Sequence, residues 1–188
     1  MRFSIVPSPF DESAVAPCEP ARYVQYLAEG KADEVATRHP GAWVIGADTI
    51  VLRGDRILNK PASPAEARQM LAHLSGSKHE VLTGLHLVCT QRAFTHTQVV
   101  GTEVTFKELT AVEIDWYIGS GEPFDKAGAY AIQGMGTFLV RGIRGSYTNV
   151  VGLPVCEVIE QLIAAGAVRL VAAQKGAADT IEIKFPVV

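Results

Sequence analysis

The stretch from Gly121 to Gly134 combines residue types that neither a strand nor a helix requires. It holds an acid, Asp125, a lysine, Lys126, and a carboxamide, Gln133, among glycines and alanines around Tyr130. Small residues let a backbone approach a ligand closely. Lysine is a point charge suited to phosphate, and a glutamine amide can read the edge of a planar ligand. The stretch therefore predicts a site for a small, strongly anionic substrate.

Asp48 is a second candidate, because it interrupts the apolar run from 43 to 52. A charge in such a run is costly unless it is paired, protonated or bound to a metal. The alternative is an aspartate that bonds local backbone groups at a strand end. The small neighbours Gly46, Ala47 and Thr49 favour a functional carboxylate, because they clear space around it.

Three lysines are candidate phosphate ligands. Lys31 lies on a predicted helix, and Lys60 lies between Asn59 and Pro61 where a strand is expected to end. At either position a lysine is usually a solvated surface residue. Lys126 is the better phosphate candidate, because small residues flank it.

Two carboxylates near the start of the chain, Asp11 and Glu12, could be turn residues. They could instead supply oxygen ligands for Mg²⁺, which commonly uses one or two carboxylates together with substrate phosphates. The five histidines show no metal-ligand spacing. The Gly134-Met135-Gly136 run is not a dinucleotide fingerprint, because the third glycine is misplaced, and the chain has no P-loop.

Hydrophobic periodicity, turn residues and capping signals predict the elements that must position these residues. Ser63 and Thr110 are each followed three residues later by glutamate, which marks a helix start. The order of elements is not a regular βαβ alternation, so we expect one α/β domain with a mixed sheet. The predicted strands are 3–6, 43–52, 81–90, 99–106 and 137–140, and the predicted helices are 20–38, 64–75, 111–117 and 150–165, the last interrupted by Pro154.

Composition bounds the class of protein. The chain has 188 residues, enough for one domain with a good core, and 48% hydrophobic against 20% charged residues is a globular profile. A net charge of −3 gives no general basic field for nucleic acid. No apolar stretch fits a signal peptide or a membrane span. The three cysteines suggest buried reduced thiols and a cytoplasmic location.

From about Phe3 to Gly166 the chain resembles the Maf family of nucleoside triphosphate pyrophosphatases. The resemblance implies an elongated, two-lobed α/β fold with a central mixed sheet, related to the inosine triphosphate pyrophosphatases. It also implies hydrolysis to the monophosphate and pyrophosphate with a divalent cation, Mg²⁺ or Mn²⁺, and a homodimer. The motifs that carry it are Gly46-Ala47-Asp48-Thr49, Lys60-Pro61, Leu74-Ser75-Gly76, Thr83-Gly84, Thr102-Glu103-Val104, Gly121-Glu122-Pro123, the run from Asp125 to Tyr130, Ile132-Gln133-Gly134 and the run from Gly145 to Pro154.

The Asp-Lys-Ala-Gly-Ala-Tyr and Ile-Gln-Gly motifs are similar to those of the branch acting on dTTP and UTP. By this resemblance Asp48 corresponds to the proton acceptor and, with Glu12, to a metal-binding position. Thr49 and Gln133 match positions tied to substrate choice. The polar positions lining the site are Glu12, Lys31, Lys60 and Lys126.

The chain departs from the family at its start. Family members normally begin with a strand, a Ser-x-Ser-Pro-Arg-Arg loop and a helix, and the match here begins just after that helix. The alternative function is therefore a catalytically impaired nucleotide-binding or regulatory protein linked to arrest of cell division. We expect the Maf-like domain to span 1–170, followed by a tail, 171–188, with an edge strand near 181–185.

Overall fold

A five-stranded antiparallel sheet forms the centre of the computed structural model, which describes residues 3–170. The strand order is β2-β1-β3-β4-β5, and every neighbouring pair is antiparallel. The single α/β domain is confirmed, but within the described residues the expected mixed sheet is wrong. Short turns join β1 to β2 and β3 to β4, and such turns can join only antiparallel strands. The strands are β1 (Val44–Arg53), β2 (Arg56–Leu58), β3 (Lys78–Cys89), β4 (Phe94–Phe106) and β5 (Val140–Arg144).

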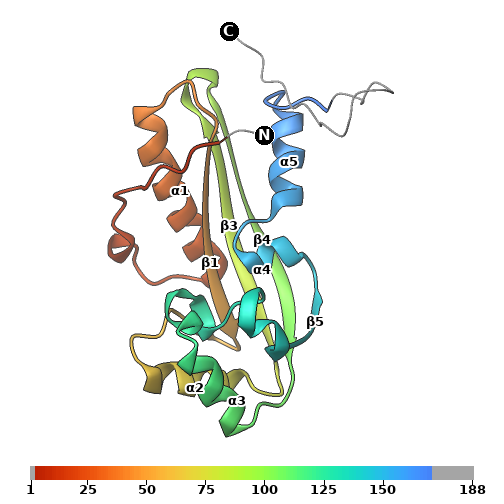
Figure 1. The fold of residues 1–188 in the computed structure, drawn as a ribbon. Helices are drawn as coiled ribbons and strands as arrows, with labels where there is room; N and C mark the ends of the chain where they lie inside the picture. Colours follow the sequence, from red (N-terminus) through yellow and green to blue (C-terminus); the bar gives the residue numbers. More distant parts are fainter. Residues whose placement is uncertain (1–2, 171–188) are drawn as a thin grey trace.

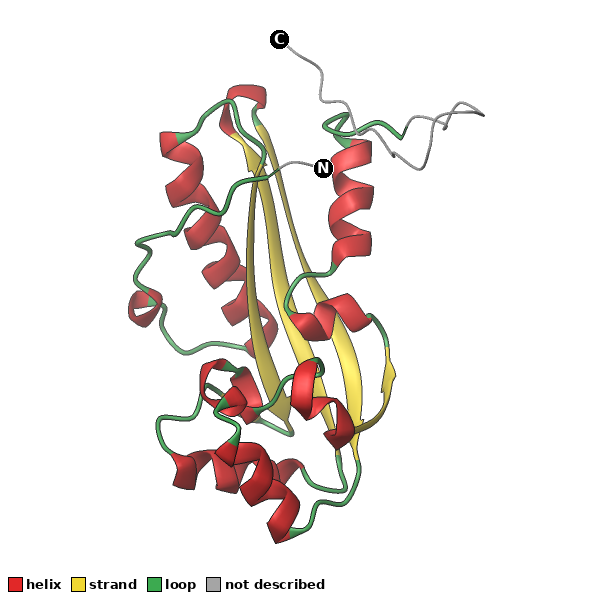
Figure 2. Ribbon diagram, in the orientation of Figure 1, coloured by secondary structure: helices red, strands yellow, loops and turns green. Residues whose placement is uncertain are grey.

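Helices cover both faces of the sheet and build a second lobe at one end (Figures 1 and 2). The strand residues Gly46 and Gly84 face α1, whereas Leu85 and Leu87 of β3 pack against α5 on the opposite face. Helices α2 and α3 lie at the lower end of the strands, which makes the molecule elongated. The helices are α1 (Pro20–Arg38), α2 (Pro64–Leu74), α3 (Ala111–Gly119), α4 (Tyr147–Val151) and α5 (Val155–Ala164).

The predicted helix starts are confirmed by their capping contacts. The hydroxyl of Ser63 accepts from the amide of Glu66 at the start of α2. Thr110 and Glu113 form a reciprocal capping box at the start of α3. Each contact satisfies amides that lack a partner within the helix, so local sequence alone decides where these helices begin.

Three predicted elements differ from the structure. The expected strand at 3–6 is exposed chain that pairs with no described strand. The expected strand at 137–140 is mostly a 3₁₀ helix, Gly134–Leu139, and Val140 begins β5. The hydroxyl of Thr137 bonds the carbonyl oxygens of Ile132 and Gly134, and such local bonds compete with strand formation. The helix expected from 150 to 165 is divided into α4 and α5 at Gly152.

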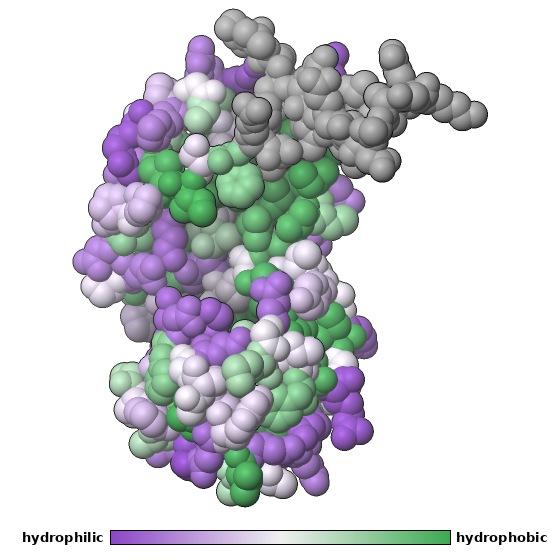
Figure 3. Space-filling view, viewed as in Figure 1, coloured by the Kyte–Doolittle hydropathy of each residue, from purple (hydrophilic) through white to green (hydrophobic). Residues whose placement is uncertain are grey.

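The core is largest in the lower lobe, where α2, α3 and the ends of the strands enclose a buried cluster that includes Leu71, Phe106 and Tyr117. A smaller cluster lies between α5 and the upper strands. In Figure 3 the molecule narrows between the lobes, and hydrophilic side chains gather at the narrowing. Polar residues therefore collect where the two apolar clusters are separated.

The remaining expectations about the chain have mixed outcomes. All three cysteines are free, but only Cys89 is buried, so the expected burial of Cys18 and Cys156 is wrong. None of the helices in residues 3–170 has both the length and the apolar character needed to cross a bilayer. The edge strand expected near 181–185 lies outside the described residues, and the domain boundary at 170 stays a prediction.

Candidate active site

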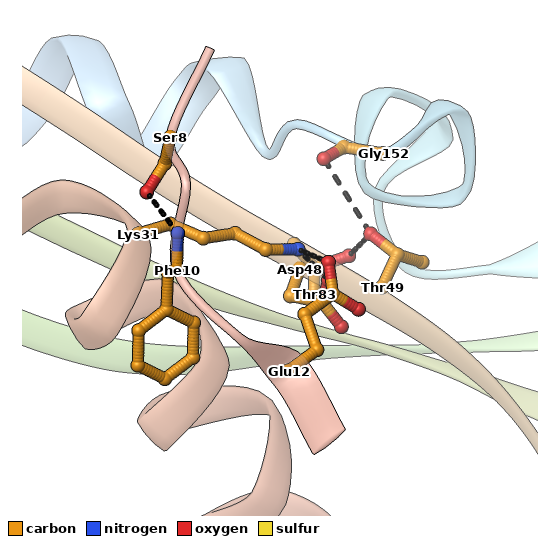
Figure 4. Close-up of polar contacts among 8 residues, drawn as sticks. All are labelled: Ser8, Phe10, Glu12, Lys31, Asp48, Thr49, Thr83 and Gly152. Carbon is orange, nitrogen blue, oxygen red and sulfur yellow. Dashed lines mark hydrogen bonds and ion pairs between the residues drawn. The ribbon is translucent and has the colours of Figure 1, made fainter. Parts of the chain in front are cut away.

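Three of the predicted site residues meet in one ion-pair cluster at the middle of β1 (Figure 4). Lys31 of α1 donates through Nζ to Oδ1 of Asp48 at 2.5 Å. The same Nζ lies 2.8 Å from Oε1 of Glu12. The exposed fractions of the side chains are 25% for Lys31, 16% for Asp48 and 57% for Glu12. One ammonium group therefore bridges a mostly buried carboxylate and a carboxylate open to solvent.

Two strand glycines set the position of α1, and hence of Lys31. Gly84 is the partner of Asp48 across the sheet. A Cβ atom at Gly84 would lie 2.1 Å from the carbonyl oxygen of Val24, and one at Gly46 would lie 2.3 Å from that of Ala28. The backbone of α1 thus rests directly on the backbone of β1 and β3, which only glycine allows. This contact holds Lys31 over Asp48.

The extended segment before α1 brings Glu12 to the cluster. The ring of Phe10 lies against the backbone of α1 at Gly30, where a Cβ would be 2.3 Å from ring atom Cε2. Asp11 accepts from the amide of Ser13 at 3.0 Å and caps the 3₁₀ turn Glu12–Ala14. Of the two candidate carboxylates, Asp11 is therefore a turn residue and Glu12 faces Lys31.

Burial and charge act in opposite directions on Asp48. Burial raises the pKa of its carboxyl group above the ordinary 3.8, and the negative charge of Glu12 adds to this. The hydrogen bond and charge of Lys31, and the charge of Lys60, lower that pKa without cancelling the rise. The pKa of Lys31 is raised, because its bonds to both carboxylates outweigh the opposing effect of burial. Asp48 is thus a stronger base than a solvated aspartate and is paired with a lysine that stays charged.

The other two lysines lie around the loop that follows α3. Lys126 is part-exposed and contacts Oδ2 of Asp125 at 2.6 Å. This contact lowers the pKa of Asp125, and the positive charge of Lys60 lowers it further. The charge of Lys60 thus acts on a carboxylate of the cluster and on one of the loop. The amide of Gly128 donates to the carbonyl of Asn59 at 3.2 Å and joins the two segments.

Thr49 does not join the ion-pair cluster. It follows Asp48 directly on β1, so its side chain points to the opposite face of the sheet. There its hydroxyl lies 2.8 Å from the hydroxyl of Thr83 and 3.5 Å from the carbonyl oxygen of Gly152. The hydroxyl of Thr83 in turn donates to the carbonyl of Asn149 at 3.3 Å. Thr49 therefore contacts the end of α4, which the sequence did not predict.

Gln133 lies in the second lobe, immediately before the 3₁₀ helix Gly134–Leu139. Its side chain is exposed and makes no hydrogen bond to another described residue. The predicted residues thus fall into three places: the cluster on the α1 face of the sheet, the Thr49 contact on the other face, and the loop of the second lobe.

The chemistry of the donors fits a hard divalent cation. Glu12 and Asp48 converge on one ammonium group, so both carboxylates already face a shared positive charge. No group of three histidine, cysteine, aspartate or glutamate side chains with metal-binding geometry occurs among residues 3–170. Two carboxylates, completed by substrate phosphates and water, are a usual environment for Mg²⁺.

Comparisons with known proteins identify the family of the chain. A family model described as Maf-like protein matches residues 1–165. A dTTP/UTP pyrophosphatase of Syntrophus aciditrophicus is 50% identical over 160 residues, which is 85% of this chain and 78% of the relative. The protein of the same name from Myxococcus xanthus is 49% identical over 166 residues, 88% of this chain and 83% of its own length. A third, from Halalkalibacterium halodurans, is 47% identical over 160 residues, 85% of this chain and 83% of its length. With a family model that matches most of its length and relatives about half identical to it, the chain belongs to the family of Maf-like proteins.

Proposed function

We propose that this protein hydrolyses dTTP and UTP to the corresponding monophosphates and pyrophosphate. The observation that carries the proposal is the pairing of Asp48, whose pKa burial raises, with the charged Lys31 in a chain about half identical to proteins named dTTP/UTP pyrophosphatase. A mostly buried base beside a fixed cation suits the activation of water near a phosphoanhydride.

Asp48 would act as the general base. A water molecule attacks the α-phosphorus while Asp48 accepts its proton, and the bond from that phosphorus to the bridging oxygen breaks. The electron pair of this bond leaves on the pyrophosphate, where the charge increases. Lys60 and Lys126 stabilise that charge, each as a point charge on phosphate oxygens. Lys31 holds the Asp48 carboxylate in place and favours its ionised form.

Glu12 and Asp48 would hold a divalent metal ion, Mg²⁺ or Mn²⁺. A cation bound there would neutralise charge on phosphate oxygens. Lys31 contacts both carboxylates, so its ammonium group would have to move aside or share them with the cation. The protein's part is to keep the two carboxylates together on the α1 face of the sheet.

Gln133 would read the base. Its side chain is exposed on the loop of the second lobe, and a carboxamide offers both a donor and an acceptor to a pyrimidine edge. Thr49 would affect substrate choice through the end of α4, which its hydroxyl contacts at Gly152. A homodimer, a cytoplasmic location and the absence of nucleic-acid and membrane partners stay predictions.

The test is a quantitative assay of products. We expect purified protein with Mg²⁺ to convert UTP and dTTP into monophosphate and pyrophosphate in equal amounts, and a chelator to stop the reaction. Release of orthophosphate in place of pyrophosphate would refute cleavage at the α–β anhydride. Tight binding of UTP without turnover would favour the regulatory alternative instead.

A further inference from the structure

The loop that carries Gln133 is anchored by side chains at two points. The phenolic oxygen of Tyr117, in α3, accepts a hydrogen bond from the amide of Ala131 at 3.0 Å. The carboxylate of Glu122 accepts one from the amide of Gly136 at 2.9 Å. These two amides stand on either side of Gln133 in the chain, so the backbone of that residue is restrained from both directions.

The two anchors lie close to each other, because both approach the loop at Gly136. Tyr117 is fully buried, and burial, followed by its contact with Glu122, raises the pKa of its hydroxyl, which therefore stays protonated. Its oxygen accepts from the Ala131 amide, and the Glu122 carboxylate accepts from the Gly136 amide. Two hydrogen bonds thus hold the loop, one on each side of Gln133.

The Gly-Met-Gly run after Gln133 is explained by these two anchors. A Cβ at Gly136 would lie 2.3 Å from the carbonyl oxygen of Ala131 and 2.6 Å from the Tyr117 hydroxyl. Gly134 has φ of 63°, and a Cβ there would lie 2.1 Å from Oε1 of Glu122. Gly136 has no room for a side chain, and at Gly134 a side chain would be strained by the positive φ and would displace the Glu122 carboxylate. The two glycines allow the loop to close on Tyr117 and Glu122.

Gln133 is left free by the same arrangement. The hydroxyl of Thr137 lies 2.8 Å from the carbonyl oxygen of Gly134 and 3.0 Å from that of Ile132, so the backbone around Gln133 is bonded within the protein. The Gln133 side chain is exposed and bonds no described residue. Its amide is therefore presented to a ligand from a fixed backbone.

We propose that Tyr117 and Glu122 are positioning residues that set the preference for uracil and thymine over cytosine by fixing Gln133, an inference that rests on the proposed function. Uracil and thymine present a ring N–H donor beside a carbonyl acceptor, whereas cytosine presents a ring acceptor beside an amino donor. On a mobile loop the carboxamide could approach the base from many positions and pair with either pattern. A fixed backbone limits the positions from which the carboxamide reaches the base, so the base whose donor and acceptor do not match is left with unpaired groups, which is how a site rejects a close analogue.

The test compares Tyr117→Phe with Tyr130→Phe. The control also removes one buried hydroxyl near the loop. The Tyr130 hydroxyl lies 2.8 Å from Nε2 of His79 and is not one of the two anchors. We expect Tyr117→Phe to lower the UTP-over-CTP ratio of kcat/KM about three- to tenfold, the worth of one hydrogen bond, mainly through KM. We expect Tyr130→Phe to lower thermal stability and keep the ratio.

A second measurement does not depend on turnover. Amide hydrogen exchange at Ala131 and Gly136 should accelerate in Tyr117→Phe and in Glu122→Ala, whereas Glu122→Gln, which keeps an acceptor oxygen, should restore the Gly136 protection. Unchanged exchange in Tyr117→Phe, an unchanged nucleotide ratio, or an equal change of the ratio in Tyr130→Phe would each overturn the inference. If the parent protein turns over neither nucleotide, the proposed function fails, and the same ratio is then measured as binding of UMP against CMP by titration calorimetry.

Discussion

Replacing Gly84 by alanine should disable the site without changing any charged group in it. Gly84 pairs with Asp48 across the sheet, and a Cβ there would lie 2.1 Å from the carbonyl oxygen of Val24. Ordinary contacts begin at 3.4 Å, so α1 would have to retreat by about 1 Å. Lys31 moves with the helix, and its 2.5 Å bond to Asp48 lengthens beyond good hydrogen-bond geometry.

The expected magnitudes follow from this displacement. Overpacking of a close contact costs about 1–3 kcal/mol in unfolding free energy, which lowers the thermal midpoint of a chain of this size by roughly 2–12 °C. A shift of about 1 Å in a catalytic group can lower the rate roughly 10²-fold. We therefore expect kcat/KM for UTP to fall by about two orders of magnitude. The loss of stability does not account for this fall at a temperature where the variant is folded.

The assay is pyrophosphate release from UTP at a temperature where both variants are folded, with thermal unfolding in parallel. Gly142→Ala is the matched control, because Gly142 is also a strand glycine and a Cβ there would meet no atom within 4 Å. If Gly84→Ala keeps kcat/KM within about twofold of Gly142→Ala, the backbone contact of α1 does not position Lys31. The account of the site as a glycine-dependent assembly would then be wrong.

Four further predictions concern single side chains. Asp48→Asn should lower kcat on the order of 10²–10⁴-fold without lowering the thermal midpoint, because it removes a charge that burial disfavours; steady-state activity within a few-fold of the parent would contradict its role as base. Lys31→Met should move the acidic limb of the kcat/KM pH profile upward, because the bond from Lys31 lowers the pKa of Asp48 while burial already holds it above 3.8; an unmoved limb would separate Lys31 from the base. Lys126→Ala should weaken transition-state binding by about 1–3 kcal/mol, seen as a lower kcat/KM for UTP, and unchanged kinetics would make it a surface lysine. Burial lowers the pKa of His79 to about 4, so between about pH 6.5 and 4 the unfolded chain binds a proton that the folded chain does not. As the pH decreases through that window, the unfolding free energy should decrease by up to roughly 3 kcal/mol. Urea unfolding of His79→Gln should lack this decrease.

Local signals were sufficient for much of the fold. The starts of α2 and α3 follow from capping residues, and the adjacency of β3 and β4 follows from two strand-like runs with a short polar connection. The 3₁₀ helix Gly134–Leu139 could not be predicted in this way. Its conformation depends on Tyr117 and Glu122, which lie more than ten residues earlier in the chain. Periodicity reports on burial along a segment and contains nothing about such side-chain anchors.

The residues of the candidate site could be named from the sequence, but their arrangement in space could not. The resemblance supplied Asp48, Lys31 and Glu12, and the structure brings these three together. It did not indicate that Thr49 faces the other side of the sheet, although strand alternation requires this once Asp48 is placed. Gly84 was quoted only as part of a motif, and its structural role depends on a helix sixty residues away. A glycine within an apolar strand was the available signal, since it often marks a close approach of backbone.

The neighbouring positions of Asp48 and Thr49 on β1 have a consequence for how this chain can change in length. A one-residue insertion or deletion earlier in β1 would shift its register against β3, so the carboxylate would turn toward Thr83 and the threonine toward Lys31. The contact of Asp48 with Lys31 and that of Thr49 with Thr83 would both be lost in one event, whereas most point substitutions alter only one of them. Length variation over evolution is therefore expected in turns such as that at Gly54, where no neighbour constrains the backbone, and not between Val44 and Asp48.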